Sequence, residues 1–202
     1  MSFLNHRKPF YGWVVVVSLG VAGGLSCFVG VGNFGLFVTP MSEDLGLGNS
    51  YFGWALSARL LGFAISGPII GRLIDRYGSR VPLAVAGLLF GGSAMGFAFV
   101  NAGGQVIGIT LFAGVMGFWG SSTLYLTIPV AKWFVRKRGR AMSLFFAGVP
   151  LGIGIASPLT QLLVDAVGWR QAWLVLGAIG GLSIAAISLV FVRNRPSDLG
   201  LL

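Results

Sequence analysis

The sequence has few charged side chains and few of the residues that build most catalytic and metal sites. Only 9% of its 202 residues are charged, five residues are acidic, and cysteine and histidine occur once each. The single cysteine, Cys27, excludes a disulfide framework within the chain and, with a single histidine, a zinc site made of several Cys and His ligands. We therefore expect no metal site.

The same scarcity argues against an enzyme. The histidine, His6, precedes the first apolar stretch, so no serine within an apolar segment has a histidine base at matching depth, as a serine protease of the membrane would need. Asp75 and Asp165 are predicted to lie at opposite faces of the membrane, which excludes a paired-carboxylate site. We expect neither catalysis nor a cofactor.

What the sequence has in abundance is apolar surface. Hydrophobic residues make up 55% of the chain and the mean hydropathy is +0.88, which is typical of an integral membrane protein. A span needs about 20 apolar residues, and its backbone must be paired internally. Six apolar runs meet this requirement and predict an all-α polytopic protein with six transmembrane helices, at roughly 12–39, 51–71, 81–100, 105–131, 141–164 and 171–192.

The distribution of positive charge predicts the orientation of these spans. With six spans, 12 of the 14 basic residues fall on the side that also holds both termini. Basic residues concentrate in cytoplasmic loops, so both termini are predicted to be cytoplasmic, in the cell membrane. Topology thus explains the net charge of +9, which excludes nucleic acid as the expected partner and leaves the lipid bilayer with its anionic headgroups.

Thirty-three glycines would weaken soluble helices, but small residues let helices in a bilayer approach closely. They recur four residues apart in the predicted spans, and we interpret this recurrence as helix packing. The pairs are Gly20/Gly24, Gly87/Gly91, Gly92/Gly96, Ala113/Gly117, Gly148/Gly152 and Gly177/Gly181.

The predicted loop between the second and third spans reads "GRLIDRYGSR" at 71–80. An ordinary positively charged loop would explain its arginines but not its aspartate and glycines. The pattern resembles the signature of the major facilitator superfamily. The resemblance implies a cytoplasmic gate that closes in the outward-facing state, formed by Gly71, Asp75, Arg76, Gly78 and Arg80.

The resemblance covers most of the chain and points to one branch. The strings "FGLF" at 34–37, "WFVRKRGRA" at 133–141 and "GWRQA" at 168–172 are similar to the monocarboxylate and oxalate/formate transporters of this superfamily. Ala113 is a departure, because many members carry arginine there, so a proton-relay role is not carried over. The implied fold is one half of a twelve-helix bundle: residues 1–202 form one six-helix domain, and 193–202 begin a cytoplasmic linker.

The branch implies a small organic anion, a mono- or dicarboxylate, as the substrate of a secondary transporter that works by alternating access. Such a transporter needs a second six-helix half, from the same chain or another. The alternative is a six-helix scaffold or regulatory partner that does not transport.

Four residues are candidates for the substrate path. Arg59 lies well inside the second apolar run, and arginine binds carboxylate in a bidentate manner; the alternative is a guanidinium that reaches the headgroups or makes a structural hydrogen bond. Asn33 lies at nearly the same depth, with an interhelical hydrogen bond as its alternative. Trp119 and Tyr125 offer aromatic and hydroxyl surface, and the alternative role for both is packing against other helices.

Overall fold

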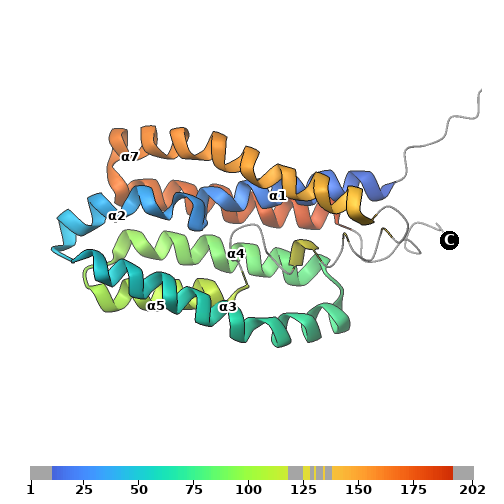
Figure 1. Ribbon diagram of the computed structural model, residues 1–202, viewed down its shortest axis with the longest axis horizontal. Coiled ribbons are helices and arrows are strands. Elements are labelled where there is room, and N and C mark those ends of the chain that lie inside the picture. The colour runs from blue at the N-terminus through green and yellow to red at the C-terminus, as the bar shows by residue number, and fades with distance from the viewer. Residues whose placement is uncertain (1–10, 118–124, 128–129, 131–133, 135–137, 193–202) are drawn as a thin grey trace, which may run out of the picture.

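The computed structural model describes residues 11–117, 125–127, 130, 134 and 138–192, and all regular elements among them are helices. Figure 1 shows them as an elongated bundle. In chain order they are α1 (Tyr11–Val29), α2 (Val31–Leu45), α3 (Asn49–Tyr77), α4 (Arg80–Gly96), the 3-10 turn η1 (Phe97–Phe99), α5 (Gly103–Val115) and α7 (Arg138–Phe191).

The described helices follow the apolar runs of the sequence. The first run forms two helices, because Gly30 adopts an extended backbone (φ −83°, ψ −173°) between α1 and α2. The 54 residues of α7 contain the fifth and sixth runs, divided at Gly168 (φ 80°, ψ 161°). We call 138–167 the first arm of α7 and 169–191 the second arm. The expected all-helical, apolar class is confirmed, whereas part of the fourth run lies outside the described residues.

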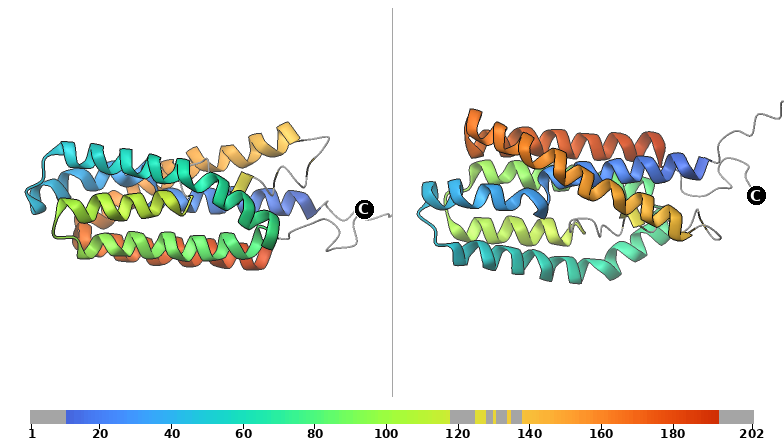
Figure 2. Two further views of the ribbon diagram at one scale, coloured as in Figure 1. Left: turned by 90° about the horizontal axis from the view of Figure 1, so that it is seen from below. Right: turned by 45° about the horizontal axis from the view of Figure 1, so that its top comes forward.

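Four stretches of the described chain are long and apolar enough to cross a membrane. In this count α1 and α2 together form one stretch, and the two arms of α7 together form another. They are Gly12–Leu45, Asn49–Tyr77, Arg80–Phe99 and Arg138–Phe191. The two arms of α7 run in opposite directions in Figures 1 and 2, so Gly168 marks a reversal of the chain. At 1.5 Å per residue, the second arm spans roughly 34 Å, enough to cross a hydrocarbon core alone.

The two ends of the bundle differ in charge. One end, which we call the motif end, holds the α3–α4 turn, the start of α1 and the end of α7 (Figure 1). Its described charges are mostly arginines: Arg72, Arg76, Arg80, Arg138 and Arg140, with Asp75 among them. The opposite end holds the α2–α3 turn and Gly168, and its charges are Glu43, Asp44, Asp165 and Arg170.

Glycines allow two close contacts between α7 and earlier helices. In the contact of α1 with the first arm, a Cβ on Gly152 would lie 2.4 Å from the Cα of Gly24. In the contact of α4 with the second arm, a Cβ on Gly91 would lie 2.5 Å from the carbonyl oxygen of Gly177. Neither helix pair has room for a side chain at these positions, which confirms the packing role predicted for these glycines.

The third close contact joins α3 to α5. A Cβ on Gly62 would lie 2.5 Å from the Leu111 carbonyl oxygen, and one on Gly114 would lie 2.1 Å from the Arg59 carbonyl oxygen. Gly92 differs from these glycines, because a Cβ there would meet no heavy atom within 4 Å. The prediction of a packing pair at Gly92/Gly96 is therefore wrong for Gly92: it lies on the outward side of α4.

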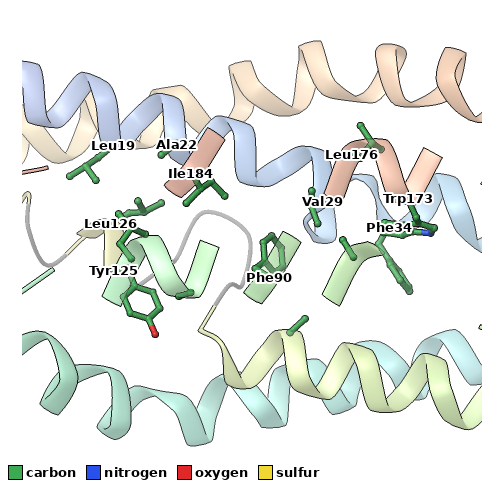
Figure 3. Packing of buried hydrophobic residues seen from close by; sticks show 14 of the residues in the cluster. Leu19, Ala22, Val29, Phe34, Phe90, Tyr125, Leu126, Trp173, Leu176 and Ile184 are labelled. Carbon is green, nitrogen blue, oxygen red and sulfur yellow. The ribbon is translucent and has the colours of Figure 1, made fainter. Parts of the chain in front are cut away.

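Buried apolar side chains from all of these helices form one core. Toward the opposite end Trp173 stacks on Phe37 with ring centroids 4.1 Å apart and lies 4.7 Å from the Phe97 ring. Figure 3 shows Trp173 beside Phe34, with Tyr125 farther along the bundle. This aromatic cluster joins α2, η1 and the second arm of α7.

Candidate functional site

Arg59 is buried inside the bundle, with 2% of its surface exposed. It lies ten residues after the start of α3 at Asn49, about 15 Å along the helix axis. Its guanidinium carbon is 5.5 Å from the centroid of the Phe90 ring on α4, a distance suited to a cation–π contact. Charged groups at membrane depth face protein or a water-filled cavity, and the Arg59 side chain is buried against α4.

The helices around Arg59 are held at close range. Gly114 of α5 packs against the Arg59 backbone, and Gly62 follows Arg59 by almost one turn of α3 on the same side. The backbone that carries the guanidinium is therefore fixed by two glycine contacts. Such rigid support is what a side chain needs if it is to recognise a ligand by geometry.

Asn33, near the start of α2, is fully buried and bonded to the first arm of α7. Its amide nitrogen donates to the Thr160 hydroxyl at 2.9 Å, and its amide oxygen accepts from the Ser157 hydroxyl at 2.9 Å. The interhelical hydrogen bond considered as the alternative for Asn33 is therefore present. The described contacts of Arg59 are with Phe90 of α4 and Gly114 of α5, whereas the Asn33 side chain is hydrogen-bonded to α7.

Tyr125 lies in the core with 4% of its surface exposed, where its ring projects from its backbone trace toward α3 (Figure 3). It borders Gly117, at which a Cβ would lie 3.2 Å from the Tyr125 ring and 2.1 Å from Ile70 of α3. Trp119, the fourth candidate, lies outside the described residues.

The motif 71–80 forms the last turns of α3, the α3–α4 turn and the first residue of α4. Gly78 ends α3 with φ 75° and ψ −179°, a conformation that is essentially restricted to glycine. Gly71 has open space around it, since a Cβ there would meet no heavy atom within 4 Å. Asp75 and Arg76 are exposed, and the Arg76 guanidinium carbon lies 5.3 Å from the centroid of the Tyr77 ring.

Arg80 points to a different partner. Its Nη2 donates to the Leu189 carbonyl oxygen near the end of α7, and its own carbonyl oxygen accepts from the Ser188 hydroxyl at 2.6 Å. The structure therefore divides the motif into residues on the exposed side of α3 and an arginine that binds α7.

Several polar contacts were not predicted from the sequence. Ser157, Thr160 and Ser188 look like ordinary small polar residues of an apolar run, and only the fold shows which distant residue each one meets. Arg170 forms an ion pair with Asp44 and lies over the Trp169 ring at 4.2 Å. In the described part of the chain no three His, Cys, Asp or Glu residues lie close enough together to hold a metal ion.

Comparisons with known proteins agree with the resemblance seen in the sequence. The model of the Major Facilitator Superfamily matches residues 19–201. Monocarboxylate transporter 2 of Rattus norvegicus is 31% identical over 172 residues, and Monocarboxylate transporter 1 of Homo sapiens is 28% identical over 169. Each match covers 84% of this chain but only 34% and 33% of the relative. The chain thus spans about a third of the length of the curated relatives it matches, and these are transporters, not enzymes.

Proposed function

Because the chain belongs to the major facilitator superfamily, we propose that it forms the N-terminal half of a secondary transporter for small organic anions. The observation that carries this proposal is the match to monocarboxylate transporters over 84% of the chain. Alternating access would come from rocking of this half against a second six-helix half. The arginine-rich motif end is then the cytoplasmic end, as the positive-inside rule requires.

The outer surface of the bundle supports a partner of this kind. One face of α3 exposes large apolar side chains, with Trp54 at 69%, Leu61 at 62% and Ile65 at 61%. The first arm of α7 likewise exposes Leu151 at 67% and Leu162 at 66%. Apolar surfaces this large must be covered in a stable protein, and lipid and the second half are the partners that would cover them.

Arg59 is our candidate for recognition of the substrate charge. It holds a cation at membrane depth on a backbone that Gly62 and Gly114 fix in place. A carboxylate would bind the planar guanidinium through two parallel hydrogen bonds. Tyr125, which is buried and close to α3, and Trp119 are candidates to line the substrate path. Asn33 would contribute by holding α2 to α7, or by exchanging one of its two hydrogen bonds for a hydrogen bond to the substrate.

Asp75 and Arg76 would form the gate. They are exposed at the motif end, next to a glycine with open space at Gly71, where the second half can approach. A carboxylate there can accept hydrogen bonds from the N-terminus of an opposing helix. The variant Asp75→Asn should slow turnover severalfold without changing substrate affinity.

The test is uptake of radiolabelled lactate and succinate into proteoliposomes that contain the protein as the cell makes it. Arg59→Ala should raise KM by at least tenfold, and Arg59→Lys should not restore it, because an ammonium cannot make the bidentate contact. The matched control is Arg72→Ala, which removes an exposed arginine from the same helix and should leave KM unchanged. A normal KM in a folded Arg59→Ala protein would remove Arg59 from the site.

The same assay separates the transporter from the scaffold considered above. A protein that is folded and inserted but moves no carboxylate above the level of empty liposomes would support the scaffold.

A further inference from the structure

The start of α4 and the end of α7 are joined by two hydrogen bonds that run in opposite directions. The Arg80 side chain donates to the Leu189 carbonyl oxygen, and the Ser188 hydroxyl donates to the Arg80 carbonyl oxygen at 2.6 Å. Ser188 is fully buried. We call these three residues the Arg80 clamp.

The clamp satisfies groups that a helix end leaves unpaired. The last four carbonyl groups of an α-helix have no partner within the helix, and Leu189 lies in the last turn of α7, which ends at Phe191. The C-terminal end of a helix also carries partial negative charge, so a cationic donor is favoured there. Arg80 supplies such a donor, and a hydrogen bond from a charged group is roughly twice as strong as one between neutral groups.

The second arm of α7 contacts α4, and the residues that follow α4, at two further levels. At mid-depth Gly91 of α4 packs against the backbone of Gly177 and Gly181 in the second arm of α7, with no space for a Cβ. At the opposite end the Arg170 Nη2 donates to the Val100 carbonyl oxygen, one residue after η1, at 3.4 Å. Three separate contacts thus make α4 and the second arm one unit.

The gate candidates lie on a different helix from Arg80. Asp75 and Arg76 are exposed on α3, and Gly78 separates them from α4 with a backbone conformation that ends the helix sharply. The motif therefore has one side fixed to α7 and one side that faces outward.

We propose that Arg80 is a positioning residue, not a gate contact: it fixes the α3–α4 turn to the end of α7, and the Arg80 clamp stays closed throughout the transport cycle. This inference rests on the proposed function, because it assigns a role within the transport cycle. It reassigns one of the five residues expected to form the gate. It also predicts that α4 and the second arm move as a single body.

The first experiment compares turnover among variants at the motif end. Arg80→Ala should lower the maximal uptake rate about tenfold, the factor that corresponds to roughly 1.4 kcal/mol, with an unchanged KM. Arg80→Lys should recover part of the rate, since lysine can still donate one charged hydrogen bond to a carbonyl. Arg72→Ala is the matched control for charge and should retain the full rate. Equal rates for Arg80→Ala and Arg72→Ala would overturn the positioning role.

The second experiment asks whether the clamp opens during transport. In a background lacking other reactive cysteines, including Cys27→Ser, the double variant Arg80→Cys/Ser188→Cys replaces the two hydrogen bonds by a disulfide, which mass spectrometry detects in membranes. We expect the oxidised protein to transport at least as fast as the reduced one. Transport that stops on oxidation and returns on reduction would show that the contact opens and would overturn the proposal.

The cross-link also separates failure of this inference from failure of the proposed function. Disulfide formation between positions 80 and 188 reports their proximity and needs no transport measurement. If the wild-type protein moves no carboxylate while the disulfide forms readily, the transport proposal fails and the clamp stands as a structural contact. If neither a disulfide nor a cross-link by a short reagent that reacts with two thiols forms, positions 80 and 188 are not neighbours and the clamp is refuted, whatever the protein transports.

Discussion

Adjacent glycines in α4 provide a controlled test of the packing that holds this bundle together. Gly91 and Gly92 are consecutive residues in the middle of one helix. A Cβ on Gly91 would lie 2.5 Å from the Gly177 carbonyl oxygen and 2.6 Å from the Gly181 Cα, whereas a Cβ on Gly92 would meet nothing within 4 Å. Gly91→Ala should therefore destabilise the protein, and Gly92→Ala should not.

The magnitude follows from the size of the overlap. Carbon atoms in contact prefer a separation of about 3.5–4.0 Å, so the new methyl group at Gly91 requires α4 and the second arm of α7 to separate by roughly 1 Å. Overpacking of this kind typically costs about 1–3 kcal/mol. Alanine also favours the helix over glycine by about 0.5–1 kcal/mol, but this gain applies to both positions and cancels in the comparison. The difference between the two variants should be about 1–3 kcal/mol.

Thermal unfolding in detergent, followed by tryptophan fluorescence, measures this difference. At roughly 2–4 °C per kcal/mol for a protein of this size, Gly91→Ala should unfold several degrees below Gly92→Ala, and the latter should unfold at or above the wild-type temperature. Identical midpoints for the two variants would refute the close approach of α4 and α7.

Three further predictions use the same readout. Gly152→Ala, placed against α1, should lower the midpoint, whereas Gly154→Ala, which faces open space, should not; reversed behaviour would argue against the contact of α1 with α7. Gly78→Ala should lower the free energy of unfolding by about 1–3 kcal/mol, because the backbone angles of Gly78 suit only glycine. Gly46→Asn should be tolerated, because asparagine adopts the left-handed conformation found at Gly46. Equal effects of the two variants would contradict this distinction. Asn33→Leu removes two interhelical hydrogen bonds and should cost about 0.6–2 kcal/mol; an unchanged midpoint would show that these bonds do not contribute.

The class of the fold could be predicted from sequence because apolar run length and the placement of arginine are strong signals. The bounds of α3 and α4, and the two outer ends of α7, lie near boundaries of apolar runs. Two features were not predictable in this way. The break at Gly30 lies inside an apolar run with no proline or charge beside it, and the outward position of Gly92 depends on which face of α4 meets α7. Glycine spacing marks Gly91 and Gly92 equally, and only the packing distinguishes them.

The candidate site was predictable in residue type but not in contacts. A buried arginine in an apolar run was recognisable because charge there is rare, and the structure places Arg59 inside the bundle. The bonds of Asn33 to Ser157 and Thr160 join positions more than 120 residues apart, a relation that no local pattern contains. The same applies to Arg80, whose sequence motif indicates a gate but whose side chain contacts α7.

The central claim is that this chain is part of a transporter that recognises the negative charge of a small organic acid. Its most direct test is counterflow. Proteoliposomes loaded with unlabelled lactate and diluted into labelled lactate should accumulate label. Excess unlabelled lactate outside should reduce this accumulation, whereas lactamide, which has the same shape without the charge, should not. We predict that label accumulates only when the protein is present and that lactamide does not reduce the accumulation. Absence of counterflow with every carboxylate tried, or equal competition by lactamide, would contradict the account.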